Sequence, residues 1–434
     1  MAVINWDAVR DEATGYLRDL IRIDTTNPPG NERAAAAYLA DVLARDGIPA
    51  RLLGPTPDRP SLVARLDGSG ERGPLLLQGH TDVVPADPAE WTHHPFSGDL
   101  ADGCIWGRGA LDMKGTLVMQ LMAMLLARRT GLRPRGDLIF AAVADEEAAG
   151  NLGAGWLVDH HPDLVQAEVA LGEVGGYTMH VGDRRFYPVQ VSEKVGHHLR
   201  LSVRGDAGHG SQPIRDGAMA RAGEILTRLT RRRLPLHVTP VAEAYIRALA
   251  AAQPALLGLL DPARVEQTLA EMGADARQFE AILHNTASPT IINGGYKNNV
   301  IPGVVQIHVD GRLLPGLTSD EYLREIRELL GDEVEIEVHH TPTHTEAPTG
   351  AFFQQFQGII DELDPGATVV PMLISAVTDA RHFARLGIPT YGFGPVLLPR
   401  EMPFWRLFHS ADERIPVAGL LFGVRAVYRV VERY

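Results

Sequence analysis

The sequence predicts an α/β fold, in which a mixed sheet carries helices on both faces and a smaller α+β unit is inserted. Up to about residue 175, helical segments alternate with short apolar runs, as in a sheet covered on both faces. From about residue 195, strand-like runs alternate apolar and polar side chains, which indicates a sheet with one open face. The 434 residues exceed one ordinary domain. We therefore expect a first domain at 1–194 and 342–434 and an inserted unit at 195–341.

Elements of the first domain follow from periodicity and chain breakers. A helix is expected over Trp6–Arg22, and a second helix begins at Asn31 and Glu32 and ends at Gly47. The apolar run 117–127 predicts a buried helix that is too short to span a bilayer. Short apolar runs that end in glycine or acidic residues predict strands at 61–68, 74–79, 137–147 and 169–176.

The inserted unit combines alternating strands with amphipathic helices. Strands are predicted at 195–213, 289–295, 304–316 and 333–341. Amphipathic helices are predicted at 218–232 and 320–331. A long helical region, rich in alanine and leucine, is expected from about 241 to 284.

Composition argues against several classes of function. The 54 acidic and 41 basic residues give a net charge of −13, which argues against nucleic acid or an anionic membrane as the main partner. Cys104 is the only cysteine, so one chain holds neither a disulfide nor a thiolate zinc cluster, as expected in a reducing compartment. The N-terminal residues lack a signal-peptide pattern. We expect a cytoplasmic protein without a membrane anchor.

The residues that carry chemistry begin in the segment 75–115. His80 and Asp82 follow a predicted strand, where residues two apart face the same way, so the Asp82 carboxylate can orient the His80 imidazole. Asp112 precedes the buried helix, at the positive end of its dipole. Each residue alone is more often structural, as a polar loop histidine or a helix N-cap. Their combination with later acids and a second histidine favours a metal site.

Further acids follow other predicted strands. Asp145, Glu146 and Glu147 end one strand, and a solvated acidic turn is the alternative explanation for them. Beside a metal, one glutamate can ligate while its neighbour accepts a proton from bound water. Glu173 ends another strand, and His409 adds a second imidazole. Two histidines with several carboxylates form a ligand set that suits zinc, manganese or cobalt.

The ordered motifs of this chain resemble those of the aminoacylase, carboxypeptidase and succinyl-diaminopimelate desuccinylase family of two-metal peptidases. The resemblance is nearest to the carboxypeptidase S-like members. GHTD together with GRGALDMKG is a specific signature, whereas the other motifs are weak alone. The motifs cover essentially the whole chain, in the order GHTDVVP, WTHHPFSG, DGCIWGRGALDMKG, ADEE, GEVGG, AGHGSQP, NNVIPG, DGRLLPG, TDARHFARLGIPTYGFGP and HSADERI.

The resemblance implies a centre of two divalent metal ions, with Zn²⁺ expected and Mn²⁺ or Co²⁺ as alternatives. Its ligands would be His80, Asp112, Glu147, Glu173 and His409. Asp112 would bridge the two ions. His80 and Glu173 would complete one coordination sphere, whereas Glu147 and His409 would complete the other. Asp82 would brace His80, and Glu146 would be the general base acting on the water that the ions share.

The inserted unit resembles the lid of this family, which usually also forms a dimer interface. His209 matches the lid histidine that stabilises the oxyanion, in dimeric members across to the partner's active site. Asn299 and Arg312 would hold the substrate's carbonyl and terminal carboxylate, since a planar guanidinium forks onto a carboxylate. A surface ion pair is the alternative role for Arg312. Gly394 would let the backbone approach the same carboxylate.

Two departures from the family pattern affect these assignments. Glu173 is followed by Val174, where many relatives have glycine or proline, so Glu168 is the fallback for this ligand. The helical stretch between Arg233 and His284 enlarges the lid, and we expect it to reshape the substrate pocket.

The expected activity is metal-dependent hydrolysis of an amide bond next to a free carboxylate, in N-acyl amino acids or short peptides. The alternatives are a biosynthetic deacetylase or desuccinylase, and a non-catalytic peptide-binding relative on the same fold. All five ligand positions, Glu146 and His209 are present together, which favours an enzyme, expected to be a homodimer through the inserted unit. The sequence contains no HExxH, GxSxG or Walker motif that would indicate another chemistry.

Overall fold

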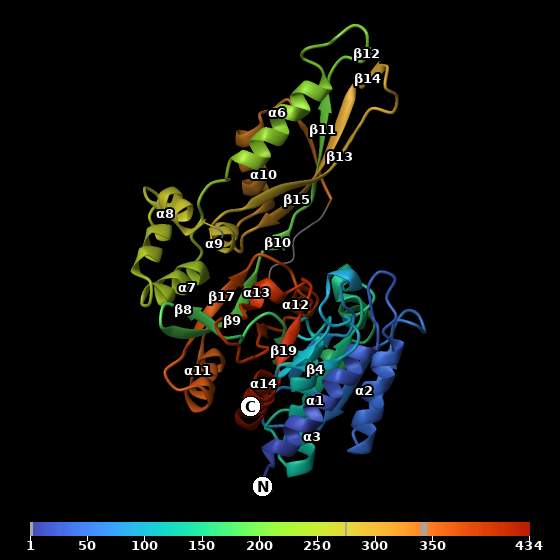
Figure 1. Cartoon of the computed structure of the whole chain (residues 1–434), viewed down its shortest axis with the longest axis vertical. Coiled ribbons are helices and arrows are strands. Elements are labelled where there is room, and N and C mark those ends of the chain that lie inside the picture. Colours follow the sequence, from blue (N-terminus) through green and yellow to red (C-terminus); the bar gives the residue numbers. More distant parts are fainter. Residues whose placement is uncertain (1–2, 274–275, 340–344) are drawn as a thin grey trace. The chain divides into compact units, whose positions relative to one another are not determined.

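The chain forms two compact units. The computed structural model describes residues 3–273, 276–339 and 345–434, and Figure 1 traces its elements in sequence order. The first unit comprises Met1–Val191, Thr345–Met372 and Thr378–Tyr434, and the second comprises Ser192–His344 and Leu373–Val377. The boundary expected at 341/342 lies outside the described residues. No sequence pattern predicts that the short piece Leu373–Val377 groups with the second unit.

A nine-stranded mixed sheet organises the first unit and confirms the predicted fold class. Its strand order is β1-β2-β6-β3-β7-β18-β9-β17, with β8 paired to β9. The strands are β1 Ala50–Leu53, β2 Ser61–Leu66, β3 Leu75–His80, β6 Leu138–Val143, β7 Val169–Gly172, β8 Met179–Val181, β9 Arg184–Glu193, β17 Thr368–Ile374 and β18 Thr390–Gly392. β3 runs parallel to β6 and β7, so the carboxyl ends of these three strands lie at one edge of the sheet.

Helices cover both faces of this sheet. On one face α3 packs with α1 and α14, and Gly79 of β3 faces Leu117 of α3. On the other face Leu76 clusters with Leu157 of α4 and Phe383 of α12. α3 is buried on all sides along most of its length, which explains why its sequence is apolar all round. The helices are α1 Trp6–Arg22, α2 Arg33–Arg45, α3 Lys114–Thr130, α4 Ala154–His160, α5 Pro162–Val165, α11 Ala351–Leu363, α12 Ala380–Ala384, α13 Phe404–Leu407 and α14 Val417–Arg433.

A small three-stranded sheet joins distant parts of the first unit. It consists of β4 (Asp99–Ala101), β5 (Cys104–Trp106) and β19 (Arg414–Pro416), with β5 in the middle. β19 pairs antiparallel with β5. This pairing places the residues before β19 beside those after β5, although some 300 positions separate them in the sequence.

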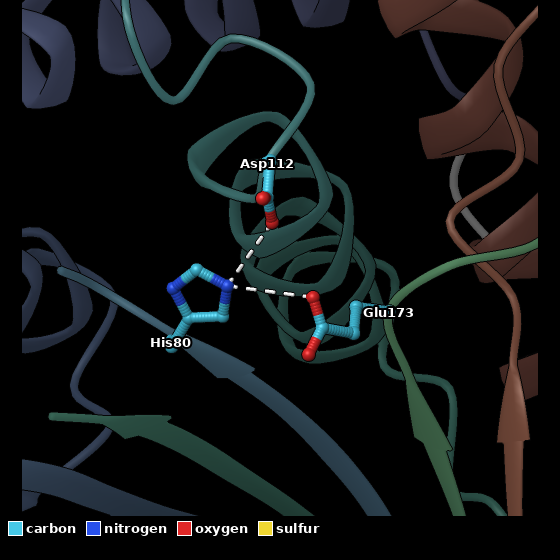
Figure 2. A group of neighbouring side chains, drawn as sticks. All are labelled: His80, Asp112 and Glu173. Carbon is cyan, nitrogen blue, oxygen red and sulfur yellow. Dashed lines mark hydrogen bonds and ion pairs between the residues drawn. The ribbon is translucent and has the colours of Figure 1, made fainter. Parts of the chain in front are cut away.

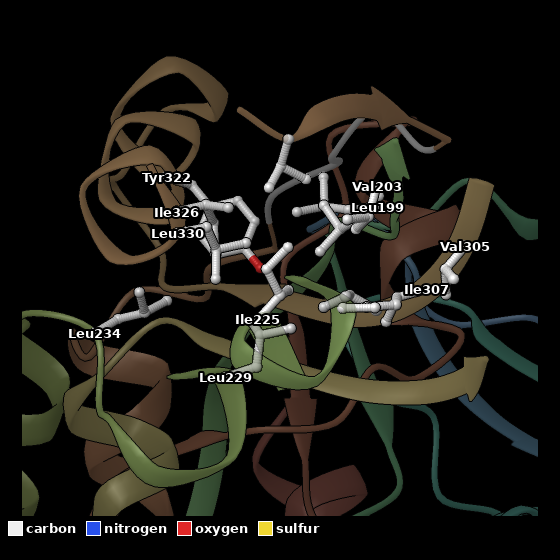
Figure 3. Packing of buried hydrophobic residues seen from close by; sticks show 14 of the residues in the cluster. Leu199, Val203, Ile225, Leu229, Leu234, Val305, Ile307, Tyr322, Ile326 and Leu330 are labelled. Atoms are coloured by element: carbon white, nitrogen blue, oxygen red, sulfur yellow. The ribbon is translucent and has the colours of Figure 1, made fainter. Parts of the chain in front are cut away.

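An antiparallel sheet with one covered face forms the second unit. β15 pairs with β13 along one edge and with β11 and β10 along the other, and β16 follows β11. Helices α6 and α10 cover it, and Figure 3 shows Ile225 of α6 and Ile326 of α10 in the shared core. Alternate residues of β15 are buried, as the sequence pattern predicts. The elements are β10 Val195–Gly196, β11 Leu199–Arg204, α6 Ala218–Arg231, β13 Thr286–Gly294, β15 Val304–Leu313, α10 Ser319–Leu330 and β16 Glu335–Val338.

The predicted long helical region of the second unit is divided into short pieces. Prolines at 254 and 262 and a glycine at 273 lie at the breaks, because proline and glycine interrupt a helix. The pieces are α7 Pro240–Ala250, a 3₁₀ helix Pro254–Leu260, α8 Val265–Met272 and α9 Ala276–Leu283. Across the described part of the chain, no helix combines the length and the apolar character that crossing a membrane requires.

Candidate metal centre

Strand ends bring the candidate ligands of the first unit together. His80 is the last residue of β3, Glu146 and Glu147 follow β6, and Glu173 follows β7. Because these strands are parallel neighbours, their carboxyl ends deliver all four side chains to one edge of the sheet. Asp112 arrives from the segment that precedes α3.

His80, Asp112 and Glu173 form the first of two triads. The Nε2 atom of His80 lies 3.1 Å from Oδ1 of Asp112 and 3.4 Å from Oε2 of Glu173. Figure 2 shows the imidazole pointing at both carboxylates. The three residues are 1%, 3% and 6% exposed. The opposite nitrogen, Nδ1, donates to the Asp82 carbonyl at 2.8 Å, so Nε2 presents its lone pair to the carboxylates when the ring is neutral.

Asp112, Glu147 and His409 form the second triad. The Nε2 atom of His409 lies 2.7 Å from Oδ2 of Asp112 and 3.5 Å from Oε2 of Glu147. Asp112 therefore turns one carboxylate oxygen to each triad. The Oε1 atom of Glu147 is buried without a hydrogen-bond partner among the described residues. Both triads have the geometry of a cation site, since their ligand atoms lie within 4.8 Å of one another.

Asp82 differs from the expected brace in the atoms that it uses. Its carboxylate is 3.6 Å from Nδ1 of His80, and the backbone carbonyl makes the hydrogen bond instead. The carboxylate accepts hydrogen bonds from the backbone N–H groups of Glu146 and Glu147, each at 3.1 Å. It also accepts one from the Asn27 side chain at 2.8 Å. Asp82 thus orients His80 through its main chain and the two glutamates through its side chain.

Glu146 lies beside the triads without being part of either. Its Oε2 atom is 4.0 Å from Nε2 of His80, and its side chain is 12% exposed. Burial raises the pKa of this carboxyl well above its usual value, and the neighbouring Glu173 carboxylate adds to the effect. A carboxylate whose pKa is raised is a better proton acceptor, as a general base requires.

Residues 145–150, which we call the acidic turn, have an unusual backbone. Glu146–Ala148 form a single 3₁₀ turn between Asp145 and Ala149, which have φ values of 72° and 87°. Non-glycine residues rarely adopt this left-handed conformation, which costs about 1–3 kcal/mol at each position. Arg59 forms an ion pair with Asp145 at 3.0 Å and helps to hold the start of the turn.

The electrostatics of the two triads suits the binding of cations. Burial raises the pKa of Glu173 to about 7, although His80 opposes the shift. Hydrogen bonds to Asp112 and Glu147 raise the pKa of His409 to about 10. For Asp112, the two imidazoles outweigh burial and lower the pKa. Without a cation, protons must occupy several of these groups, so the nitrogen and oxygen donors fit divalent metal ions that would replace those protons.

Glu413 is a site residue that the sequence analysis gave no role. Its buried carboxylate accepts hydrogen bonds from the backbone N–H groups of Leu111 at 2.7 Å and Asp112 at 3.0 Å. It also accepts from Gly109 N–H and from the guanidinium of Arg108. Glu413 therefore fixes the segment that presents Asp112 to both triads. The acidic residue in the HSADERI motif was the available signal, but its partners lie 301 to 305 positions away.

Three of the predicted residues belong to the second unit. His209 ends β12 (Gly208–His209), which pairs with β14 (Val300–Ile301), so that Asn299 lies next to it in space. Gly210 N–H donates to the Asn299 carbonyl at 2.9 Å. The guanidinium of Arg312 donates to both oxygens of Asp310, at 2.7 and 3.0 Å, which is the ion pair considered as its alternative role.

The remaining predicted residues lie in the first unit. Gly394 is buried, and its N–H donates to the Gly175 carbonyl at 2.9 Å. A Cβ atom at Gly394 would lie 2.4 Å from Thr116 Oγ1, so only glycine fits there. Glu168, the fallback ligand, pairs with Arg72 and accepts the N–H of residue 73. Glu168 is part of neither triad, whereas Glu173 belongs to the first triad.

The chain matches peptidase family M20/M25/M40 over residues 76–433. Probable carboxypeptidase S-like 2 of Dictyostelium discoideum is 26% identical over 394 residues, which cover 86% of this chain and 74% of the relative. Succinyl-diaminopimelate desuccinylase of Methylorubrum extorquens is 30% identical, covering 96% of this chain and 97% of the relative. These matches confirm the resemblance drawn from the motifs.

The fold also matches solved structures. An M20 family metallo-carboxypeptidase from Sulfolobus solfataricus superimposes with a TM-score of 0.72 at 17% identity. The match covers 97% of this chain and 99% of the other. At this level of identity the likeness concerns the fold alone.

Proposed function

Because the chain belongs to peptidase family M20/M25/M40, a family of metal-dependent hydrolases, we propose that it cleaves an amide bond next to a free carboxylate. The proposed substrates are N-acyl amino acids or short peptides. The observation that carries the proposal is the position of Asp112, which turns one oxygen to each of two triads beside a half-buried glutamate that is free to act as a base.

The two triads are the proposed metal ligands. Each offers one histidine nitrogen and two carboxylate groups, and Asp112 is common to both. We propose Zn²⁺ as the ion in each, since imidazole and carboxylate donors suit it, with Mn²⁺ or Co²⁺ as alternatives. Two such ions would lower the pKa of a shared water and polarise the scissile carbonyl.

Glu146 is the proposed general base. Its raised pKa and its place beside His80 let it take a proton from the attacking water and pass it to the departing amine. Asp82 holds the backbone of Glu146 and of the ligand Glu147 with one carboxylate. The base and the ligand therefore keep a fixed relation to each other.

Residues of the second unit are the proposed substrate contacts. The pairing of β12 with β14 places His209 beside Asn299, and we propose that both approach the substrate's carbonyl. Arg312 is the proposed partner of the free carboxylate. Asp310 engages Nε and Nη2 of its guanidinium, which leaves the Nη1 donors for a ligand. Gly394 is a further proposed approach point for that carboxylate.

A homodimer through the second unit is also proposed. Among the described residues, β13 pairs only with β15, so its other edge is open. Ile291 and Ile292 of this strand are 54% and 53% exposed, and Tyr296 beyond it is 86% exposed. An open strand edge with exposed apolar side chains is suited to pair with a second copy.

The cytoplasm remains our proposed location. Cys104 is buried and forms no disulfide.

A biosynthetic deacetylase or desuccinylase is the second candidate. The relative with 30% identity over nearly both full lengths is a succinyl-diaminopimelate desuccinylase, which favours this candidate. The helical pieces between Arg233 and His284 are the part of the second unit that we expect to alter the substrate pocket.

A hydrolysis screen tests the proposal. Metal-stripped protein would be given N-acyl amino acids, dipeptides and N-succinyl diamino acids, with Zn²⁺, Mn²⁺ or Co²⁺ added back. The proposal expects hydrolysis only with metal, and faster for substrates with a free carboxylate than for their amides. Equal hydrolysis of acid and amide would contradict the substrate class. A clear preference for the succinyl substrate would favour the second candidate.

A further inference from the structure

We propose that Arg381 and His382 are positioning residues that hold the far end of the acidic turn and thereby fix Glu146 and Glu147. The inference rests on the proposed function, because it concerns a base and a metal ligand that the proposed function assigns. Neither residue is part of either triad.

The near end of the acidic turn is held by Asp82. Its two carboxylate oxygens accept the N–H groups of Glu146 and Glu147, each at 3.1 Å. These bonds fix the backbone N–H groups of the two glutamates. They leave the exit of the turn, at Ala149 and Gly150, to be held by other groups.

The far end is held from α12. The carbonyl of Ala149 accepts a hydrogen bond from Nη2 of Arg381 at 2.6 Å and one from Nε2 of His382 at 3.1 Å. Two side-chain donors thus converge on a single backbone oxygen. His382 is 7% exposed, and burial lowers its pKa to about 4, so the ring is neutral. Its Nε2 donates to Ala149 in the tautomer that carries the proton there, and in this tautomer Nε2 does not accept from Arg381 Nε, 3.4 Å away.

The ring of His382 is confined between two glycines. A Cβ atom at Gly150 would lie 3.0 Å from Nε2 of His382, and one at Gly155 would lie 3.0 Å from Cε1. A Cβ at Gly150 would also lie 2.2 Å from Oδ1 of Asp379, the residue before α12. The start of α12 therefore packs directly against the exit of the acidic turn, with no room for the turn to shift toward it.

The conformation of the exit explains why it needs to be held. Ala149 has a φ of 87° and Gly150 a φ of 64°, and alanine disfavours this region. Without the two donors, the Ala149 carbonyl would lose the bonds that stabilise this orientation, and the turn would relax to commoner backbone conformations. Glu147, two residues earlier, would then lose its fixed position in the second triad.

Another arginine of the same region provides a matched control. Arg385, at the end of α12, pairs with Asp159 of α4 and does not contact the acidic turn. Substituting Arg385 removes a guanidinium and an ion pair from the same helix. It leaves both hydrogen bonds to Ala149 in place.

The test uses the full chain, stripped of metal and titrated with Zn²⁺ by calorimetry against a competing chelator. The variants are Arg381→Gln, whose amide ends two bonds short of the guanidinium Nη2, and His382→Phe, which has no donor. Arg381→Lys and His382→Gln are conservative replacements that keep a donor of similar reach. Loss of a group that orients a metal ligand costs about tenfold to a hundredfold in affinity or activity. We expect Arg381→Gln and His382→Phe each to weaken one of two Zn²⁺ sites by about tenfold. We expect kcat to fall similarly, with KM unchanged. The conservative replacements should recover most of the loss, and Arg385→Gln should match the wild type.

The outcomes separate the inference from the proposed function. Wild-type protein that binds fewer than two ions, or hydrolyses none of the substrates, would overturn the proposed function. If the wild type binds two ions and hydrolyses substrate, but Arg381→Gln matches it in both assays, only this inference is overturned. A rise in KM with unchanged Zn²⁺ binding would likewise overturn it, since Arg381 would then bind substrate directly. If His382→Phe does not fold, the contrast between Arg381→Gln and Arg381→Lys decides the matter alone.

Discussion

The two units of this protein hold their candidate functional residues in opposite ways. In the first unit, His80, Asp112 and Glu173 are almost fully buried, and each is reached by a hydrogen bond or ion pair from another part of the chain. In the second unit, His209 lies exposed at the end of the two-residue strand β12, and Asn299 lies exposed just before the two-residue strand β14. The difference fits the proposed roles, in which a rigid sheet edge fixes the metal ligands and an exposed surface is proposed to contact the substrate.

Substitution of the proposed base should give the largest effect and keep both metal ions. Glu146→Gln retains the shape of the side chain but removes the proton acceptor, so kcat should fall by about 10²–10⁴. Metal content by mass spectrometry should stay at the wild-type value. Unchanged turnover would refute the base, and loss of a metal ion would show that Glu146 is a ligand.

The two imidazoles of the first unit should differ in their effect on stability. His80 is 1% exposed and His409 is 45% exposed. Alanine at either position should lower activity by more than about a hundredfold. Even the loss of a residue that only orients a metal ligand can lower activity by up to about a hundredfold. Only His80→Ala should lower the melting temperature of metal-free protein clearly. Equal melting temperatures for the two alanine variants would contradict the idea that the burial of His80 contributes to stability.

Removal of His209 should affect catalysis without affecting the metal centre. One lost oxyanion donor costs roughly 10²–10³ in kcat. His209→Ala should therefore lose that much activity while keeping wild-type Zn²⁺ binding and melting temperature, because the side chain is exposed. Mixing it with Asp112→Ala protein should restore some activity if a partner supplies the histidine. No recovery in a proven mixed dimer would indicate a self-contained site.

Arg312→Ala should act on substrate binding alone. We expect KM to rise by about tenfold or more for substrates with a free carboxylate, because a hydrogen bond to a charged group contributes about 1.5–3 kcal/mol and each 1.4 kcal/mol is about a factor of ten. An amidated analogue should show no change. An equal rise for both substrates would indicate that Arg312 serves only its ion pair with Asp310.

The smallest expected effect is a pH dependence confined to the first unit. The pKa of His409 is raised to about 10 and that of Glu173 to about 7, so both groups hold protons at neutral pH in metal-free protein, Glu173 only in part. A metal ion must displace these protons, and its affinity should therefore rise with pH and fall as the pH is lowered. Calorimetry in buffers of different ionisation enthalpy should detect proton release upon Zn²⁺ binding. Absence of release would contradict these pKa shifts.

Local patterns were sufficient to predict the residues at strand ends. His80, Glu147 and Glu173 follow apolar runs that are visible in the sequence, and the parallel sheet brings them together. The role of the Asp82 carboxylate was missed, because its partners Glu146 and Glu147 lie 64 and 65 positions away. Contacts of this kind depend on the tertiary fold, and no local pattern encodes them.

Local sequence patterns also predicted the second unit only in part. Alternation in β15 predicted a sheet with one covered face. The region 241–284 was predicted as one long helical stretch, but Pro254 and Gly273 divide it. In the first unit, β9 and β17 were not predicted. β9 is buried along most of its length, and a buried strand need not alternate apolar and polar residues.

The dependence of Asp112 on Glu413 has a consequence for biosynthesis. Leu111 and Asp112 donate to a carboxylate 302 and 301 positions further along the chain. While a ribosome is still making the protein, the segment around Asp112 has neither this anchor nor His409. The nascent chain therefore cannot assemble the second triad, and a metal ion could be captured there only after the segment through Glu413 has emerged.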